Sequence, residues 1–323
     1  MTWLLRRLGL YGVAAISSLT IAFLLPRLMP GDPAAALLAR LQGRADPAAV
    51  EAMREALGMS DAPVWRQYVE WLAGLFRGDL GVSVSNFPAP VTEVLAGGIL
   101  WTTGLAGVSV VIAFLLGTGL GVLAAWKRGG WADTVLPPLF SLLGAFPYFW
   151  LAMAALYAFG FGLGWFPLRH AYDASLEPGT WAFAKSVVGH GALPALTIVV
   201  ATTGGWLLGM RNTMLTTLGE EHVLLARARG LPRWKVVWQA ARNAILPNLT
   251  GFGMALGFVV SGALLTEVVF SYPGQGYLLV QAVRAKDLPL LQGLFLTITL
   301  SVLAANVLVD LLTLAVDPRT RTA

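Results

Sequence analysis

Residues 210–247 read MRNTMLTTLGEEHVLLARARGLPRWKVVWQAARNAILP, a polar and basic interruption between two long apolar runs. Thr217 and Glu220 have the spacing of a capping box, which marks the start of a helix. Gly230 suits the position just after the end of that helix, and Pro232 suits the first position of a second one. The stretch therefore predicts a helix, a sharp turn and another helix.

The second predicted helix, residues 232–244, is amphipathic, with small and apolar residues on one arc and polar residues on the other. Trp234 and Trp238 lie one turn apart beside basic residues, which is typical of a helix at a membrane interface. An ordinary basic loop between two membrane spans explains the same pattern, so both interpretations stay open. The predicted apolar arc consists of Ala240, Ala244, Val237, Ala241, Trp234, Ile245 and Trp238.

The composition of the chain is that of a membrane protein. Hydrophobic residues make up 57% of its 323 residues and charged residues only 12%, which lies outside the usual range of a soluble domain. The net charge of +5 does not form a patch, because the charges fall in the gaps between apolar runs. We therefore expect a lipid bilayer and no nucleic acid among the partners.

Six windows of the sequence contain no charged residue, and each is long enough to cross about 30 Å of hydrocarbon as a helix. The third window exceeds one crossing, and we take its first two-thirds as the span. Arg6 and Arg7 before the first window also fit a signal peptide, but an uncleaved first helix is the better interpretation of so long an apolar run. The fold class predicted is an all-α membrane protein with six transmembrane helices. The windows are Leu8–Pro26, Gly97–Trp126, Thr134–Leu168, Gly191–Met210, Asn243–Thr266 and Leu288–Val309.

The charges between the windows predict the orientation of the chain. With the N-terminus inside, the inner segments hold 12 basic and 4 acidic residues, and the outer segments hold 10 basic and 12 acidic residues. Short loops rich in Lys and Arg stay in the cytoplasm. Both termini are therefore predicted to be cytoplasmic.

Three regions follow from this topology. Residues 1–29 form the first transmembrane helix, and residues 30–96 form a small extracytoplasmic helical segment. That segment is expected to hold helices at 47–57 and 62–76, the second with Trp65, Tyr68, Trp71 and Leu72 on one side. Residues 97–323 form a five-helix core that carries the cytoplasmic loop at about 212–246.

The loop resembles the signature loop of the permease subunits of ATP-binding-cassette (ABC) importers. The resemblance rests on Ala226, Gly230, Asn243 and the run Ile245-Leu246-Pro247, and ARARGLP followed by AARNAILP is most similar to the oligopeptide, dipeptide and nickel permeases, first subunit type. It implies a type I importer fold and a short coupling helix that docks on an ATPase subunit. The usual Glu-Ala-Ala is replaced here. The coupling residues implied are Leu224, Leu225, Ala226, Arg227, Ala228, Arg229, Gly230, Leu231 and Pro232.

Shorter motifs extend the resemblance to almost the whole chain, from Gly31 to Arg319. Each is weak alone, but their order and spacing together are specific. They are Pro30-Gly31-Asp32-Pro33, Gly78-Asp79-Leu80-Gly81, Ala145-Phe146-Pro147, Gly164-Trp165-Phe166-Pro167, Leu193-Pro194-Ala195-Leu196, residues 267–276, Asn306 with Asp310, and Asp317-Pro318-Arg319.

The resemblance also implies function, partners and location. It implies a permease subunit of an ATP-driven importer in a bacterial or archaeal cytoplasmic (inner) membrane, which moves a solute by alternating access. The expected partners are a second homologous permease, two ABC ATPase subunits and an extracytoplasmic substrate-binding protein. Peptides are the favoured substrate, and a nickel complex or another small solute is the alternative. A stand-alone secondary transporter or channel is the second hypothesis, but the six charge-free windows argue against its usual mid-membrane ion site.

The sequence offers no catalytic, cofactor or metal site. None of the four lysines follows a glycine, which excludes a phosphate-binding P-loop, so ATP and Mg²⁺ are expected on partner subunits. The chain has three histidines, no His-Glu-x-x-His pair and no cysteine, which leaves little for a zinc site. We therefore do not expect this chain to be an enzyme by itself.

Two ionisable residues lie near the ends of charge-free windows. Asp310 follows Asn306 by one helical turn, and we interpret the two as a local structural pair. Glu267 lies where the fifth window meets the outer surface. Anchoring at the lipid headgroups and a role in the solute pathway are equally open for it. The candidate outer gate consists of Glu267, Tyr272, Pro273 and Gly274.

Overall fold

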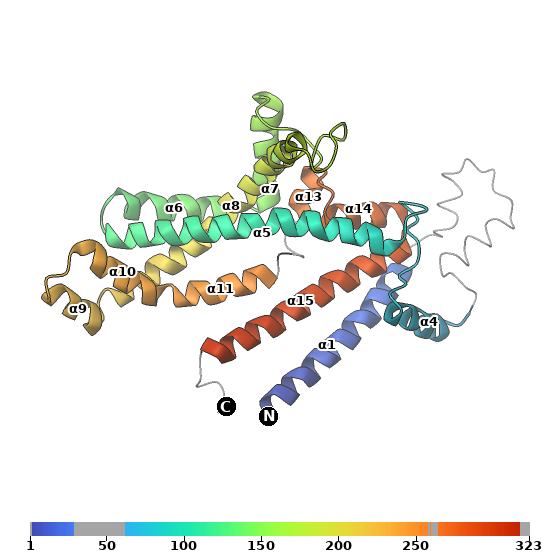
Figure 1. Ribbon diagram of the computed structural model, residues 1–323, viewed down its shortest axis with the longest axis horizontal. Helices are drawn as coiled ribbons and strands as arrows, with labels where there is room; N and C mark the ends of the chain where they lie inside the picture. Colours follow the sequence, from blue (N-terminus) through green and yellow to red (C-terminus); the bar gives the residue numbers. More distant parts are fainter. Residues whose placement is uncertain (1, 29–61, 258, 260–263, 317–323) are drawn as a thin grey trace. The chain divides into compact units, whose positions relative to one another are not determined.

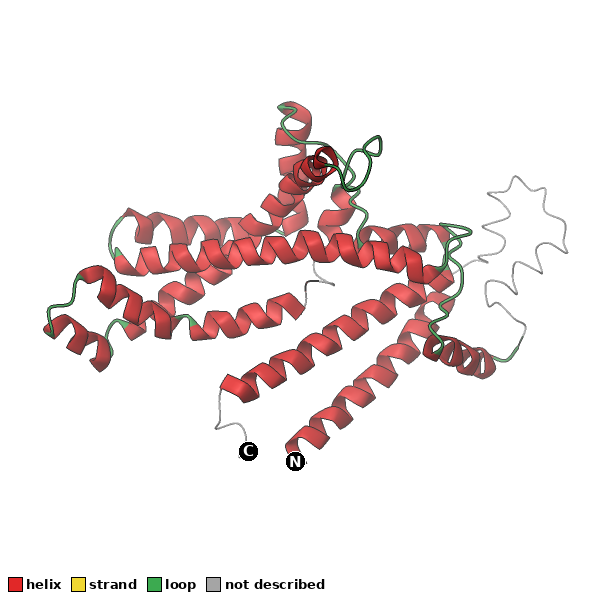
Figure 2. Ribbon diagram, viewed as in Figure 1, coloured by secondary structure: helices red, strands yellow, loops and turns green. Residues whose placement is uncertain are grey.

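The computed structural model of the protein describes residues 2–28, 62–257, 259 and 264–316. Over these residues the chain forms helices and loops, and no strand occurs in them (Figure 2). The all-α prediction is therefore confirmed for this part of the chain. The predicted helix at 47–57 and the motifs at 30–33 and 317–319 lie outside the described residues, as does the side chain of Asp310.

Figure 1 labels the helices in chain order. Their bounds are α1 Thr2–Arg27, α4 Val64–Phe76, α5 Val91–Trp126, α6 Trp131–Ala145, α7 Tyr148–Ala155, the π-helix η1 Leu156–Gly162, α8 Trp181–Thr217, α9 Glu221–Ala228, α10 Arg233–Ala244, α11 Leu246–Gly257, α13 Leu264–Val269, α14 Gln275–Ala285 and α15 Leu288–Val316.

Four described helices are long and apolar enough to cross a membrane, and a fifth span forms if one bent pair counts as a single crossing. These five agree with five of the six charge-free windows. The remaining window, Asn243–Thr266, includes residues that the structure does not describe, so a sixth span stays a prediction. The candidates are Gly9–Arg27, Val91–Trp126, Trp181–Thr217, Leu288–Val307 and the pair Trp131–Ala145 with Tyr148–Gly162.

The bent pair corrects the expectation of one continuous helix over the first two-thirds of the third window. Helices α6 and α7 meet at 94°. The break falls at Phe146, whose backbone is extended at φ −79° and ψ 137°, directly before Pro147. A proline disfavours the helical conformation of the preceding residue and donates no backbone hydrogen bond, so the helix ends there.

The described chain divides into two compact units. One holds the residues up to Thr102 together with Pro273–Ala304, and the other holds Thr103–Tyr272 and the residues from Ala305 onward.

In the first unit, α1 and α4 meet through aromatic side chains. Phe23 of α1 packs edge-on against Tyr68 at a centroid distance of 5.0 Å and lies 5.5 Å from Trp71. The hydroxyls of Tyr68 and Thr20 are 2.9 Å apart. The helix predicted at 62–76 is thus confirmed as α4, although Trp65, expected on the same side, is exposed.

A buried carboxylate joins two further segments of that unit. Asp287 precedes α15, and its Oδ1 accepts a hydrogen bond from the backbone N–H of Leu290, as a helix cap does. Its Oδ2 accepts bonds from the hydroxyl of Ser83 at 2.7 Å and from the hydroxyl and backbone N–H of Ser85 at 2.7 and 2.8 Å. The segment before α5 is therefore held to the start of α15 by one side chain.

The second unit is built around a very close approach of α5 and α8. A Cβ atom at Gly117 would lie 2.6 Å from the carbonyl oxygen of Thr203, and one at Gly121 would lie 2.6 Å from that of Leu207. These two glycines are four residues apart on one face of α5. Small residues at this spacing allow the backbones of membrane helices to touch. No larger side chain fits at either position unless the helices separate.

We predict that Gly121→Ala forces α5 and α8 apart and lowers the free energy of unfolding by about 1–3 kcal/mol, the usual cost of overpacking. Thermal unfolding of the purified protein, followed by tryptophan fluorescence, measures this change. Gly119→Ala is the matched control, because a Cβ at Gly119 meets nothing within 4 Å. Equal unfolding midpoints for the two variants would contradict the close packing.

Candidate functional site

The loop at 212–246 is anchored to the membrane helices by a cluster of small and apolar side chains. Buried residues of α9 and α10 pack against the last turns of α8 and the end of α5. Both short helices therefore share one core with α8 and the end of α5. The cluster consists of Ala125, Met210, Met214, Val223, Ala226, Val236, Val237, Ala240 and Ala244.

The start of the first loop helix differs from its prediction. Thr217 is the buried last residue of α8, so it does not begin a capping box. Glu220 occupies the cap position of α9, and its side chain makes no capping hydrogen bond there. Its Oε2 instead lies 3.3 Å from Nδ1 of His222. The capping-box prediction is wrong because α8 continues to residue 217, and its packing outweighs the local signal.

The end of that helix agrees with its prediction. Gly230 has φ +73°, a left-handed conformation that side chains with a Cβ rarely adopt. Its N–H donates to the carbonyl of Arg227 at 2.9 Å, and the N–H of Leu231 donates to the carbonyl of Ala226 at 3.3 Å. This pair of bonds is the Schellman motif, which ends a helix and turns the chain sharply.

Helix α9 has one buried and one exposed face. Val223 and Ala226 lie in the cluster, whereas Leu224 and Leu225 are 49% and 57% exposed. A Cβ at Gly230 would meet nothing within 4 Å, so the turn is also open on its outer side. The exposed leucines and the open turn make a small apolar surface, which a partner protein could contact.

The amphipathic pattern of α10 is confirmed, and its buried face includes one residue outside the predicted arc. Val236 is buried together with the predicted Val237, Ala240 and Ala244. Trp234 and Trp238, which belong to the predicted apolar arc, are 60% and 68% exposed, as a helix at a membrane interface requires. The small residues pack more closely on α8 than two indoles could, so the tryptophans are turned outward. Pro232 lies one residue before its predicted position, at the N-cap of α10.

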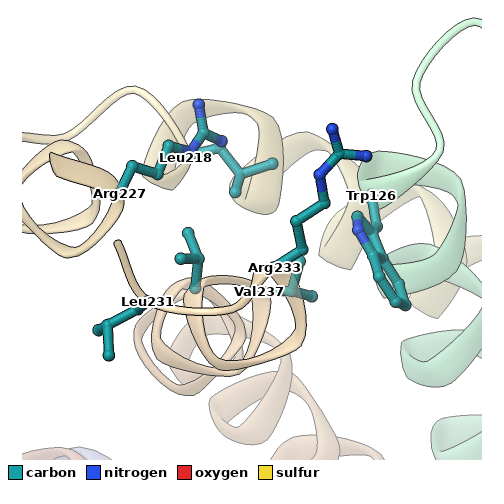
Figure 3. A pocket seen from close by; sticks show the side chains of 7 residues that line it. Trp126, Leu218, Arg227, Leu231, Arg233 and Val237 are labelled. Carbon is teal, nitrogen blue, oxygen red and sulfur yellow. The ribbon is translucent and has the colours of Figure 1, made fainter. Parts of the chain in front are cut away.

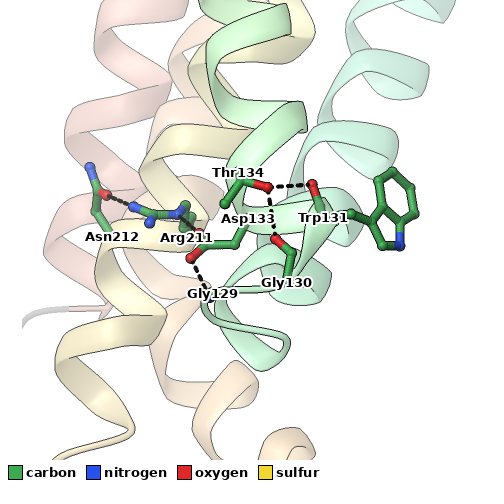
Figure 4. A network of polar contacts seen from close by, with 7 residues as sticks. All are labelled: Gly129, Gly130, Trp131, Asp133, Thr134, Arg211 and Asn212. Atoms are coloured by element: carbon green, nitrogen blue, oxygen red, sulfur yellow. Dashed lines mark hydrogen bonds and ion pairs between the residues drawn. The ribbon is translucent and has the colours of Figure 1, made fainter.

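An ion pair joins the start of α6 to the end of α8 (Figure 4). Nε of Arg211 lies 2.6 Å from Oδ1 of Asp133, whose side chain is only 8% exposed. Oδ2 of Asp133 accepts a bond from the backbone N–H of Gly129 at 2.9 Å. Sequence reasoning assigned both charges to the inner side but did not pair them.

A second polar contact missed by sequence reasoning involves Asn248 of α11. Its amide donates to the backbone carbonyl of Trp206 at 3.0 Å and to the hydroxyl of Thr118 at 3.3 Å. It therefore ties α11 to both α8 and α5. A lone amide inside an otherwise apolar window was the available signal, because such groups need a partner away from water.

Of the predicted gate residues, Glu267 and Tyr272 belong to the second unit, and Pro273 and Gly274 belong to the first. Glu267 of α13 is 0% exposed, so it is not a side chain that extends freely to the headgroups. Tyr272 is also buried, and its hydroxyl lies 3.8 Å from the position of a Cβ at Gly191 of α8. Burial, with the charge of Glu267, raises the pKa of Tyr272 to about 12, which keeps the phenol protonated.

The backbone around these two residues is tightly turned. The N–H of Tyr272 donates to the carbonyl of Glu267 at 2.8 Å, and Ser271 between them has φ +48°. The N–H of His170, itself at φ +70°, donates to the carbonyl of Phe270. In the first unit, Pro273 and then Gly274 lead into α14, of which Gly274 is the N-cap.

Comparison with known proteins gives matches along nearly the whole chain. The family described as "binding-protein-dependent transport system inner membrane component" matches residues 117–322, and its N-terminal companion family matches residues 1–95. A putative peptide permease of Brucella ovis is 35% identical and covers 99% of this chain and 98% of its own. A probable D,D-dipeptide transport permease of Escherichia coli is 34% identical, with 98% and 97% covered. A glutathione transport permease of Pectobacterium atrosepticum is 33% identical, with 98% and 97% covered.

Proposed function

This chain belongs to the binding-protein-dependent inner-membrane permeases of ABC importers, in the peptide and nickel group, and on that premise we propose that its substrates are peptides. It is a multi-pass protein of the cytoplasmic membrane. The proposal of peptides is carried by similarity over the whole length to permeases named for a peptide, a D,D-dipeptide and glutathione. No observation favours a nickel complex or a stand-alone channel.

The complete transporter, as we propose it, contains a second homologous permease and two ABC ATPase subunits that bind ATP and Mg²⁺. A binding protein delivers the peptide at the outer face. This chain contains six spans with both termini in the cytoplasm. The first span covers residues 1–29, the outer helical segment covers 30–96, and the five-helix core covers 97–323.

In this proposal the residues from Leu224 to Pro232 contact an ATPase subunit. The support is physical: Leu224 and Leu225 expose apolar surface on a helix whose other face is fixed to α8. Exposed apolar side chains on an anchored element suit a docking contact. Movement of the ATPase would then turn α9 and α10 together, and the shared core would carry that movement into α8 and the end of α5.

Peptide uptake into proteoliposomes that hold the assembled complex and its binding protein tests both the substrate and this contact. We predict that unlabelled di- and tripeptides compete with a labelled peptide, whereas nickel complexes do not. The double variant Leu224→Ala, Leu225→Ala should lower uptake about tenfold or more, because truncation at a docking contact commonly costs over 1 kcal/mol. Alanine preserves the helix.

The matched control is Gln239→Ala on the exposed side of α10, for which uptake should stay at the wild-type rate. Wild-type uptake by the double leucine variant would remove the coupling assignment. Competition by nickel complexes but not by peptides would instead remove the assignment of peptides.

The orientation is tested by single cysteines, because the chain has none of its own. Thr216, exposed at the end of α8, lies in the loop proposed to face the cytoplasm, and Ala174, exposed in the loop between η1 and α8, lies on the proposed outer side. We predict that an impermeant thiol reagent labels Ala174→Cys in intact cells and labels Thr216→Cys only after lysis. The opposite pattern would invert the topology.

We also propose that Glu267, Tyr272, Pro273 and Gly274 form an outer gate at which the peptide enters. The burial of Glu267 supports this proposal over simple anchoring, because an anchoring carboxylate would extend into the headgroup region. A charge held inside the protein needs compensating contacts, and a charged end of the peptide could supply one of them when the gate opens.

We predict that Glu267→Gln, which keeps the shape but loses the charge, lowers peptide uptake severalfold while the complex still assembles with its ATPases. Uptake in the same proteoliposomes and the subunit composition of the purified complex measure the two effects. Glu177→Gln, at an exposed position of the loop before α8, is the control. If Glu267→Gln transports every tested peptide as the wild type does, the gate assignment is wrong.

A further inference from the structure

A pocket of about 430 Å³ lies beside the loop helices, within the second unit (Figure 3). Four elements supply its walls: the end of α5, the end of α8, α9 and the start of α10. Arg227 and Leu231 belong to the proposed coupling segment Leu224–Pro232 and also line this pocket, whereas the exposed Leu224 and Leu225 do not line it. Its lining residues are Trp126, Leu218, Arg227, Leu231, Arg233, Val236 and Val237.

The charge of the pocket is entirely positive. Arg227 and Arg233 are its only ionisable lining residues. In Figure 3 their side chains extend in the same direction, and Arg233 lies beside Trp126. Neither guanidinium forms an ion pair with any residue that the structure describes. Two planar groups, each with five donors, and no acid among the lining residues make a site for an anion, and the fork of an arginine matches a phosphate best.

The remaining lining is apolar. Leu218, Leu231, Val236 and Val237 provide aliphatic surface, and Trp126 provides an indole. A free inorganic anion gains nothing from such surface, and it would lose hydration there. The pocket therefore suits an amphipathic ligand with an anionic group at one end and hydrocarbon at the other.

The position of the pocket identifies the source of such a ligand. Trp126 is the last residue of the candidate span α5, and tryptophan at the end of a span marks the membrane interface. Helix α10, which forms another wall, exposes Trp234 and Trp238, and the ammonium of Lys235 lies 5.4 Å from the Trp234 ring. Basic pockets at the ends of membrane helices bind anionic lipid headgroups.

We propose that this pocket binds the phosphodiester headgroup of an anionic phospholipid, with Arg227 and Arg233 at the phosphate and the aliphatic residues at the glycerol end of the acyl chains. An acidic segment of an ATPase subunit is disfavoured, because one wall belongs to the end of a membrane span. The inference goes beyond peptide transport and depends only on membership of a membrane-protein family. The bound lipid would join the end of α5 to the α9–α10 turn.

Ligand-induced stabilisation of the purified, delipidated complex tests the proposal. Short-chain dihexanoyl phosphatidylglycerol should raise the thermal unfolding midpoint, whereas dihexanoyl phosphatidylcholine and inorganic phosphate should not. The double variant Arg227→Gln, Arg233→Gln should weaken the apparent affinity for phosphatidylglycerol about tenfold or more, since two charge-assisted contacts are lost. Arg227→Lys with Arg233→Lys keeps the charges and should retain part of that affinity.

The matched control is Arg128→Gln with Arg242→Gln, which removes the same charge from exposed positions that do not line the pocket. It should bind phosphatidylglycerol as the wild type does. If its affinity fell as much as that of the Arg227→Gln, Arg233→Gln variant, the effect would come from the overall charge and not from the pocket. Equal stabilisation by phosphatidylcholine, or by inorganic phosphate, would overturn the anionic-lipid assignment even if the glutamine variant did not fold. A glutamine variant that keeps the lipid but loses its ATPase subunits would assign the arginines to the protein partner.

Discussion

The contact of α5 with α8 at Gly117 and Gly121 is the constraint on which the second unit depends. With no side chain between the two backbones, α5 and α8 pack as one element, and the ends of both helices come close together. Ala125 of α5 can therefore share a core with Met210 and Met214 of α8, and that core receives the two loop helices. The amide of Asn248 then joins α11 to the same pair.

This arrangement gives the loop two different faces. On its buried face, Val223, Ala226 and the small residues of α10 share one packed core with the end of α8. Its exposed face carries apolar and cationic groups that the chain itself does not cover. The Asp133–Arg211 pair ties α6, the first half of the bent pair α6–α7, to the same end of α8.

Sequence reasoning was correct where local conformational preferences and hydrophobic periodicity determine the structure. The positive φ of Gly230, the helices on either side of it and the charge-free windows follow from local chemistry and periodicity. Sequence reasoning failed where tertiary packing overrode a local sequence signal. Thr217 is a good helix cap, yet it is the buried last residue of α8. Local sequence signals compete with the burial of apolar side chains, and burying a whole helix face contributes more free energy than one local signal does.

By itself, the sequence determined that this protein is an all-helical membrane protein with a helix–turn–helix loop, because hydrophobic windows, glycine and proline act through local physics. The permease function was implied by the resemblance of its motifs to a known family. Only the tertiary structure decided which groups meet. The Asp133–Arg211 pair, the burial of Glu267 and the two arginines around one pocket join residues that are distant in the sequence or lie on different helices. Periodicity shows which residues share a face of one helix. Close packing, to which many residues contribute at once, decides which way that face is turned and which helix it contacts.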